Sequence, residues 1–279
     1  MIRRRDLVAG LTAPLILAAP AAGAAGASSA SLKGRITQGG LVFGKVAPGT
    51  RAVLDGRTLR VTPDGRFVFG FGRDHGKAAS LVLVHADGSR ETRPLAVAAR
   101  KFDVQKITGL PPRMVEPDPA DLERIKADGE AIARARTRDS AETGWATDWI
   151  WPVTGRISGV FGSQRILNGQ PRRPHFGVDV AMPTGTPIVA PADAVVSLAN
   201  PDMYFTGGTL ILDHGHGVGT LYAHLSSLEV RAEQRVRKGE PIGRIGATGR
   251  VTGPHLHWGM TWYATNVDPA LVVPPMPAP

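Results

Sequence analysis

The chain has 279 residues, of which 42% are hydrophobic and 20% charged, and its formal net charge is +9. This length allows one large or two modest domains, with the composition of an ordinary globular protein. Cysteine is absent, which excludes disulfides, cysteine-ligated zinc and a thiol nucleophile, so a metal site must use His, Asp or Glu. The positive charge suits a polyanion or a cell envelope. However, no nucleic-acid-binding motif accompanies the charge. The base composition of the gene explains the many arginines equally well.

The first 27 residues have the pattern of an export signal. Three arginines at 3–5 precede an apolar stretch at 7–19, and a run of small residues with cleavage sites follows at 21–27. The apolar stretch is too short and too rich in Ala and Gly for a comfortable membrane span. Residues 4–8 resemble a twin-arginine signal, which would export the protein already folded; the general route is the alternative. We therefore predict an exported protein of the periplasm or cell envelope.

Short apolar runs separated by turn residues fill 32–108. Asp-Gly pairs between these runs are typical of hairpins, and His75 and His85 are isolated. This pattern predicts a small antiparallel β-sandwich of about seven strands, serving as a spacer or binding module rather than as an enzyme. The candidate strands include Arg51–Leu54, Thr58–Val61, Arg66–Phe69 and Ser80–Val84.

A linker at 109–144 contains one predicted helix at about 119–137. Asp118 is a good N-cap and Pro119 suits the first helical position. The apolar side of the helix would be one narrow stripe, which predicts packing as a strap between domains. A helix that lies across an active site and blocks it is the alternative. The stripe consists of Leu122, Ile125, Gly129 and Ile132.

Residues 145–273 again read as β-strands, and a proline-rich tail follows at 274–279. Glycines supply turns, and no helical pattern is long enough for a βαβ unit, so an antiparallel sheet or sandwich is predicted. The predicted fold class is therefore mainly β, with two β domains and one linking helix.

Three histidine motifs occur in this second β region. His175 and Asp179 have a four-residue spacing that places them on one side of the backbone, and alternation in a strand places His255 and His257 on one face. His224 stands between them in a Y-x-H-L segment. Neutral imidazoles are poor core material without partners, and two imidazoles, a carboxylate and a water are the ligands of a catalytic zinc. A further histidine can move a proton or stabilise an oxyanion.

These three ordered motifs, within a glycine-rich segment from about 151 to 273, resemble the lysostaphin/LytM-type metallopeptidases, the M23 family. The resemblance implies a zinc endopeptidase, with one Zn²⁺ per chain, that acts on the peptide part of peptidoglycan. It implies an antiparallel β scaffold with a narrow groove. By position it implies His175, Asp179 and His257 as zinc ligands and His224 and His255 as the catalytic histidines, with the general base and the oxyanion-stabilising role not assigned between them.

Two alternatives belong to other classes of protein. One is a non-catalytic envelope factor that binds peptidoglycan or activates a separate amidase, and the other is a basic β protein that binds a polyanion or glycan. No nucleic-acid partner and no membrane span after signal removal are predicted. The complete set of five matching residues favours the peptidase.

Several neighbouring residues have two readings. His214 and His216 imitate a second metal cluster, but the flanking glycines favour a tight turn. Trp258 alternates to the face opposite His257, which predicts core packing. For five residues the sequence leaves open whether the side chain lines the groove or lies elsewhere: Trp262, Tyr204, Phe205, Arg165 and Asn168.

Overall fold

Seven short strands in two antiparallel sheets form the first β unit of the computed structural model, which describes residues 29–108 and 117–277. The predicted export signal lies outside these residues. One sheet has the order β1-β2-β5 and the other the order β4-β3-β6-β7. The first consists of β1 (Ser31–Gly34), β2 (Leu41–Lys45) and β5 (Arg66–Gly70). The second consists of β3 (Arg51–Leu54), β4 (Arg57–Thr58), β6 (Ala78–Val84) and β7 (Arg90–Ala96).

The local sequence explains this unit well. Asp55 and Gly56 both have left-handed backbone, with φ of 45° and 83°, as a two-residue hairpin between β3 and β4 requires. Apolar side chains of both sheets, among them Phe67 and Leu81, are fully buried. The strand predicted at Thr58–Val61 is wrong in extent, because pairing stops at Thr58. Beyond it, Leu59 N still donates to Ala52 O at 2.9 Å, and the Arg60 guanidinium binds Asp139 at 3.1 Å.

The helix predicted at about 119–137 is confirmed. A 3₁₀ turn at Pro119–Asp121 leads into α2 (Leu122–Arg136), and Asp118 Oδ1 accepts a hydrogen bond from Ala120 N at 2.9 Å. Before the helix, β8 (Val104–Ile107) pairs in parallel with β10 (Gln164–Leu167). The chain therefore reaches the second unit as a strand before it forms the helix.

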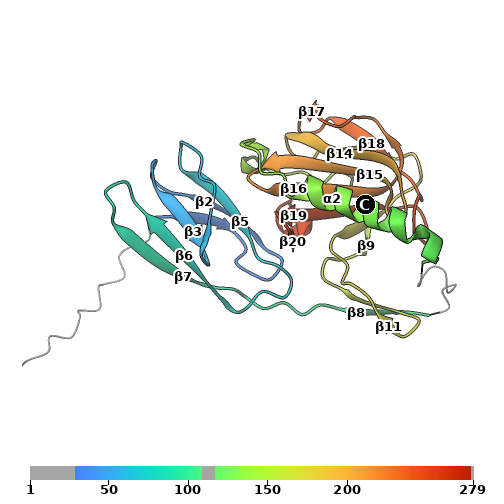
Figure 1. The fold of residues 1–279 in the computed structure, drawn as a ribbon, viewed down its shortest axis with the longest axis horizontal. Helices are drawn as coiled ribbons and strands as arrows, with labels where there is room; N and C mark the ends of the chain where they lie inside the picture. The colour runs from blue at the N-terminus through green and yellow to red at the C-terminus, as the bar shows by residue number, and fades with distance from the viewer. Residues whose placement is uncertain (1–28, 109–116, 278–279) are drawn as a thin grey trace, which may run out of the picture.

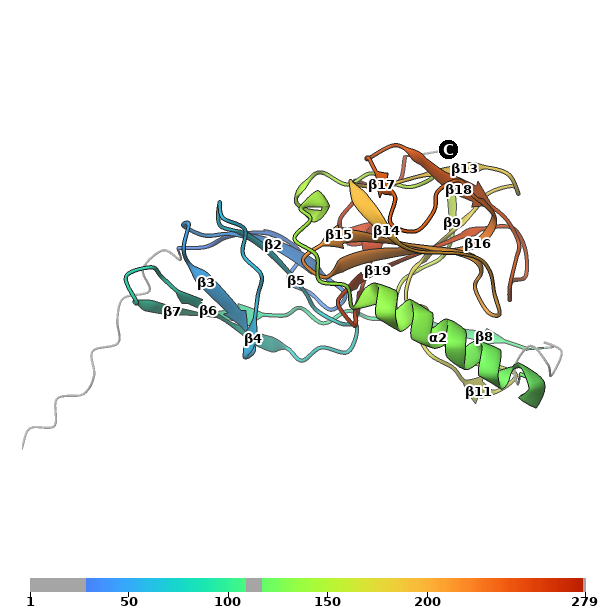
Figure 2. The ribbon, with the colours of Figure 1, turned by 45° about the horizontal axis from the view of Figure 1, so that its top comes forward.

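The predicted apolar stripe of α2 is wrong at two positions. Leu122 is 52% exposed and Gly129 is also exposed, whereas Ile132 and Ala135 pack against the cluster of Ile211, Leu221 and Ala223. Polar contacts hold the first half of the helix instead, because Arg124 Nη2 is 2.9 Å from Asp202 Oδ2 and Asp128 accepts a hydrogen bond from Tyr204 N at 2.8 Å. The helix consequently lies along β14 and β15 of the second unit rather than between the two units (Figure 2).

A ten-stranded sheet forms the second unit, with the main order β17-β14-β15-β16-β19-β12-β9 (Figure 1). Every paired neighbour is antiparallel, which confirms the predicted mainly β class and antiparallel scaffold. The strands of the main order are β9 (Arg156–Gly159), β12 (Val178–Ala181), β14 (Ala194–Met203), β15 (Gly207–Gly215), β16 (Val218–Leu228), β17 (Arg235–Val236) and β19 (Leu256–Trp262). The remaining strands are β13 (Pro187–Val189), β18 (Pro241–Ile245) and β20 (Thr265–Val267), and β11 (Gln170–Pro171) pairs with β10 in a separate small sheet. Short 3₁₀ turns lie at Gly144–Ala146 and Pro269–Leu271.

Aromatic side chains fill the core under this sheet and join it to the first unit. Trp258 is fully buried and meets Trp151 edge to face at 5.5 Å, which confirms its predicted core role. Between the units, Phe43 stacks on Trp145 with ring centroids 6.2 Å apart. The described residues include no helix of the length and apolarity that a membrane crossing needs.

Candidate metal centre

Strand pairing brings two of the predicted ligands together. Asp179 on β12 lies directly opposite His257 on β19, and His257 lies opposite Ala223 on β16. Residues directly opposite each other in an antiparallel pair project from the same face, so the carboxylate and the imidazole meet on one side of the sheet. His175 comes from the loop before β12, where its backbone N–H donates to Ser163 O at 2.8 Å.

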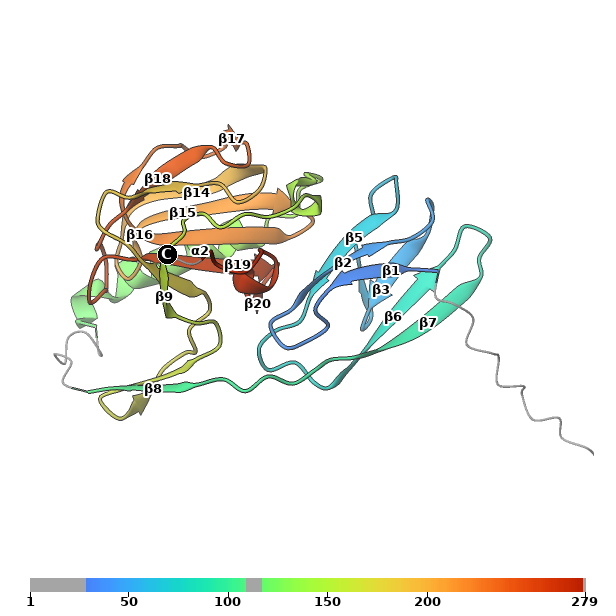
Figure 3. The same ribbon diagram turned by 180° about the vertical axis from the view of Figure 1, so that it is seen from behind.

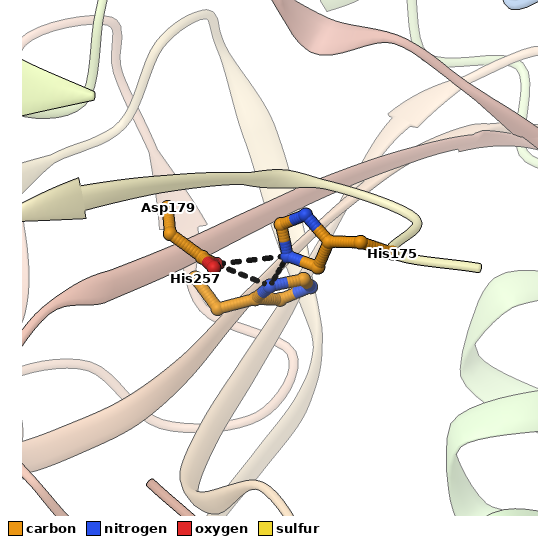
Figure 4. A group of neighbouring side chains, drawn as sticks. All are labelled: His175, Asp179 and His257. Atoms are coloured by element: carbon orange, nitrogen blue, oxygen red, sulfur yellow. Dashed lines mark hydrogen bonds and ion pairs between the residues drawn. The ribbon is translucent and has the colours of Figure 1, made fainter. Parts of the chain in front are cut away.

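Three donor atoms converge at this point (Figure 4). Asp179 Oδ1 lies 2.9 Å from His175 Nε2 and 2.9 Å from His257 Nδ1, and the two nitrogens are themselves 2.9 Å apart. His175 and Asp179 are buried, with exposures of 4% and 7%. Within residues 29–108 and 117–277, this is the one group of at least three His, Asp or Glu donors with metal-like spacing.

Hydrogen-bond chemistry shows that the triangle suits a cation. His175 Nδ1 is 3.0 Å from Val160 O, and because a carbonyl only accepts, Nδ1 carries the proton and Nε2 of the neutral ring holds a lone pair. That lone pair faces a carboxylate oxygen and the nitrogen of His257, so at most one proton is available to three acceptors. Two imidazoles and a carboxylate with a fourth position open are the ligand set of catalytic zinc. The three residues therefore form a zinc-like site.

The surroundings hold the ligands in the protonation states that metal binding needs. Burial alone would raise the pKa of Asp179, but the adjacent imidazoles of His175 and His257 outweigh it and hold that pKa well below its usual range. Burial lowers the pKa of His257. At neutral pH the site thus offers an ionised carboxylate and a neutral imidazole, as a divalent metal requires.

His224 and His255 lie beside this triangle without being part of it. Their ring centroids are 4.9 Å apart, and His255 Nε2 is 3.8 Å from Asp179 Oδ1. Each Nδ1 is 2.9 Å from a backbone carbonyl, that of Thr248 for His224 and that of Gly253 for His255. In each neutral ring Nδ1 therefore carries the proton, and Nε2 is left able to accept one. Burial lowers the pKa of His224 to about 4, which keeps it neutral at pH 7.

The backbone at His224 decides where its side chain points. Strict alternation along β16 would place His224 on the face opposite Ala223 and His257. His224 instead has a left-handed backbone, with φ of 66°, and its N–H donates to Thr206 O at 2.7 Å outside the regular ladder. This local distortion turns the ring toward His255 and His257. All five predicted site residues are consequently close together in space.

The structure places the five residues for which the sequence did not decide between the groove and another position. Trp262 is 5% exposed and belongs to the core. Tyr204 and Phe205 lie in the turn between β14 and β15, next to the segment that binds His224. Arg165 reaches the site, with Nη2 3.3 Å from Asp179 Oδ2, whereas Asn168 lies exposed in the β10–β11 turn.

His214 and His216 are buried but do not join a metal-like group among the described residues. His214 Nδ1 is 2.9 Å from Asp193 O, and its Nε2 is 2.8 Å from the Thr220 hydroxyl. His216 packs beside Trp145, with ring centroids 5.0 Å apart. Burial lowers the pKa of each of these histidines to about 4. They are therefore neutral structural residues, and the tight turn expected around them is present, with His216 at φ of 51°.

This burial predicts a loss of stability in acid. An unfolded chain protonates His214 near its ordinary pKa of about 6.5, whereas the folded chain resists until about pH 4. The contribution of His214 to the free energy of unfolding should therefore fall by about 3 kcal/mol as the pH drops through this interval, and His214 adds no pH dependence above it. Urea unfolding with chelator present, so that metal release does not contribute, would measure the fall. His214→Gln should be less stable at pH 7.5 yet lose less between pH 6.5 and 4. Equal losses in both proteins would contradict the assignment to His214.

The antiparallel sheet brings together the five residues of the predicted metallopeptidase site. Residues 173–269 match the model for Peptidase family M23, so the chain contains an M23 peptidase domain, as its motifs predicted. The matched range includes His175, Asp179, His224, His255 and His257.

Several known proteins are similar to this chain. The DD-carboxypeptidase/endopeptidase Mpg of Neisseria meningitidis is 43% identical over 125 residues, which cover 45% of this chain and 29% of Mpg. The peptidoglycan DD-endopeptidase ShyA of Vibrio cholerae is 38% identical over 131 residues, covering 47% of this chain and 28% of ShyA. The crystal structure of a peptidase M23 candidate from Pseudomonas aeruginosa is similar to this chain with a TM-score of 0.67 and 29% sequence identity.

The extent of these similarities differs. The Pseudomonas aeruginosa structure covers 86% of this chain and 95% of its own, so the likeness extends over both β units. By contrast, the chain spans less than a third of the length of Mpg and ShyA. Those two similarities therefore concern the peptidase domain and not the whole of either relative.

Proposed function

We propose that this protein is an exported zinc-dependent endopeptidase that hydrolyses peptide bonds in the stem peptides or crosslinks of peptidoglycan. The observation that carries the proposal is the His175–Asp179–His257 triangle with two further imidazoles, His224 and His255, beside it. The names of two relatives support this substrate: ShyA is a peptidoglycan DD-endopeptidase and Mpg a DD-carboxypeptidase/endopeptidase. Export, and with it the periplasm or cell envelope, rests on the signal pattern of residues 1–27.

The roles proposed for the chain's own residues follow from their geometry. His175 Nε2, Asp179 Oδ1 and His257 Nδ1 would hold the ion. When bound, zinc polarises the scissile carbonyl and lowers the pKa of a water molecule to about 7. His224 and His255 each have an Nε2 without a proton beside the triangle. One would accept the proton of the attacking water as general base and pass it to the leaving amine, and the other, carrying a proton taken up from solvent, would stabilise the developing oxyanion.

The domain assignment is part of the same proposal. Residues 32–108 would form a non-catalytic β-sandwich domain, 109–144 a linker, and 145–273 the peptidase domain, with a proline-rich tail at 274–279. The parallel pairing of β8 with β10 supports a fixed connection between these domains (Figure 3).

Digestion of purified sacculi with and without a chelator tests this function. We expect soluble muropeptides with cleaved stem peptides, identified by mass, from the zinc-loaded protein, and none after chelation. Readdition of zinc should restore cleavage. Sacculi that remain intact under every condition would contradict the proposal and favour a non-catalytic envelope factor.

A further inference from the structure

Arg165 is a positively charged residue at the metal centre that neither the ligand set nor the pair of catalytic histidines includes. It lies on β10, the central strand of a small sheet with β8 and β11 on either side. Its Nη2 is 3.3 Å from Asp179 Oδ2, the carboxylate oxygen that does not face the two ligand histidines. Its side chain remains 36% exposed, so the guanidinium stands between the ligand and solvent.

The guanidinium of Arg165 has an unused donor. Its Nε is buried and has no hydrogen-bond partner. A buried donor without an acceptor costs about 1–3 kcal/mol, and a planar guanidinium offers its N–H groups in a fork that matches a carboxylate. The contact with Asp179 uses Nη2, and because the side chain is 36% exposed, the outer N–H groups of the fork can reach a second acceptor from outside the chain.

Other arginines make this side of the site positive. Arg172 follows Arg165 across the β10–β11 hairpin, where its N–H donates to Arg165 O at 2.9 Å. Arg250 lies on the loop before β19, with its guanidinium 4.3 Å from the Phe205 ring centroid. Partial burial and the charges of Arg165 and Arg172 lower the pKa of Arg250. Like charges gathered in this way repel one another, and an anionic ligand would offset that repulsion.

We propose that Arg165 binds a free carboxylate on the residue whose amine leaves when the peptide bond is cleaved. This inference rests on the proposed function and narrows its substrate class. In an amino acid the carboxyl carbon lies about 3–4 Å from the carbonyl carbon of the preceding residue. A carboxylate there would therefore lie close to the scissile carbonyl. Arg165 lies beside the same place, since its Nη2 is 3.3 Å from Oδ2 of the ligand Asp179.

The preferred substrates follow from this contact. A C-terminal residue carries the required carboxylate, as does a diaminopimelate crosslink whose reacting amine has a carboxylate on the same carbon. An internal bond in an ordinary chain carries an amide at that position, so it would leave the Arg165 donor unsatisfied. A charged donor in the binding site that is left without its acceptor is a strong basis for discrimination between substrates.

Two stem pentapeptides ending in D-alanyl-D-alanine test the inference, one with a free C-terminal carboxylate and one with a carboxamide. The wild-type protein should cleave the acid with a kcat/KM about 10- to 100-fold higher than the amide. Arg165→Gln should lose this preference mainly through a slower reaction of the acid, with zinc content still one per chain. Arg165→Lys, which keeps the charge but not the fork, should retain part of the preference.

Arg237→Gln is the matched control, because Arg237 follows β17, which β14, β15 and β16 separate from β19 in the sheet. It should keep the wild-type preference.

Equal cleavage of both peptides by the wild-type protein would overturn the carboxylate contact and leave the proposed function intact. An equal loss on both peptides with reduced zinc in Arg165→Gln would overturn it in favour of a purely positioning role toward Asp179. A wild-type protein inactive on both peptides and on sacculi would overturn the proposed function, and this inference with it.

Discussion

Replacing His257 with alanine is expected to remove zinc from the purified protein and to abolish peptidase activity. His255→Ala, by contrast, should keep zinc and lose turnover by roughly 10²- to 10⁴-fold, the usual contribution of a general acid or base. The two residues are two positions apart and were expected on the same strand face, so sequence spacing alone does not distinguish them. Elemental analysis together with kcat on a muropeptide would measure both effects.

The different results expected follow from two sets of distances. His257 Nδ1 is 2.9 Å from both Asp179 Oδ1 and His175 Nε2, within the donor triangle. His255 Nε2 lies farther out, 3.8 Å from Asp179 Oδ1, and its Nδ1 is held by Gly253 O. Removing His257 leaves two protein ligands, fewer than the three of a catalytic zinc site, whereas removing His255 leaves all three.

A histidine outside the site provides the control for these variants. His75 in the first β unit has its Nδ1 2.9 Å from Gly76 O and contacts no ligand residue in the described structure. His75→Ala should leave zinc content and turnover unchanged. If His255→Ala and His257→Ala lost zinc equally, the proposed division between ligand and catalytic histidine would be wrong.

Adding a single methyl group at Gly177 should disturb the metal centre without removing a ligand. A Cβ at this position would lie 2.6 Å from His257 Cε1 and 2.7 Å from Trp258 O. The imidazole or the β19 backbone must move to relieve this overlap, and overpacking of this kind costs about 1–3 kcal/mol. For Gly177→Ala we expect zinc affinity to fall by roughly 10- to 100-fold, as when other supports of a ligand are changed. Competition with a chromogenic chelator would measure it.

Gly76→Ala is the corresponding control, because a Cβ at Gly76 meets no atom within 4 Å. This variant should bind zinc as tightly as the wild-type protein. Excess zinc should restore part of the activity of Gly177→Ala if the ligands are displaced rather than lost. Wild-type affinity in Gly177→Ala would show that the loop before β12 yields without moving His257.

Much of the fold and of the site could be predicted from the amino-acid sequence, because the relevant signals are local. Alternating apolar residues and Asp-Gly pairs predicted the β strands and hairpins, and Asp118 with Pro119 predicted the start of the helix. The order of three short motifs predicted the M23 domain. These signals depend on neighbours within a few residues, so they do not require knowledge of the tertiary structure.

Contacts between side chains that are distant in sequence could not be predicted in this way, because they depend on how the strands and the helix pack. The exposure of Leu122 depends on where α2 rests on β14 and β15, because a helix of mixed character takes its buried side from its contacts. Strand alternation would have pointed His224 away from the site, and the left-handed backbone at that residue reverses this. Arg165 is ten residues from His175 in the chain, and the pairing of β10 with β8 and β11 places it against Asp179. Contacts of this kind join segments distant in sequence, and their physical cause is strand register and packing rather than local propensity.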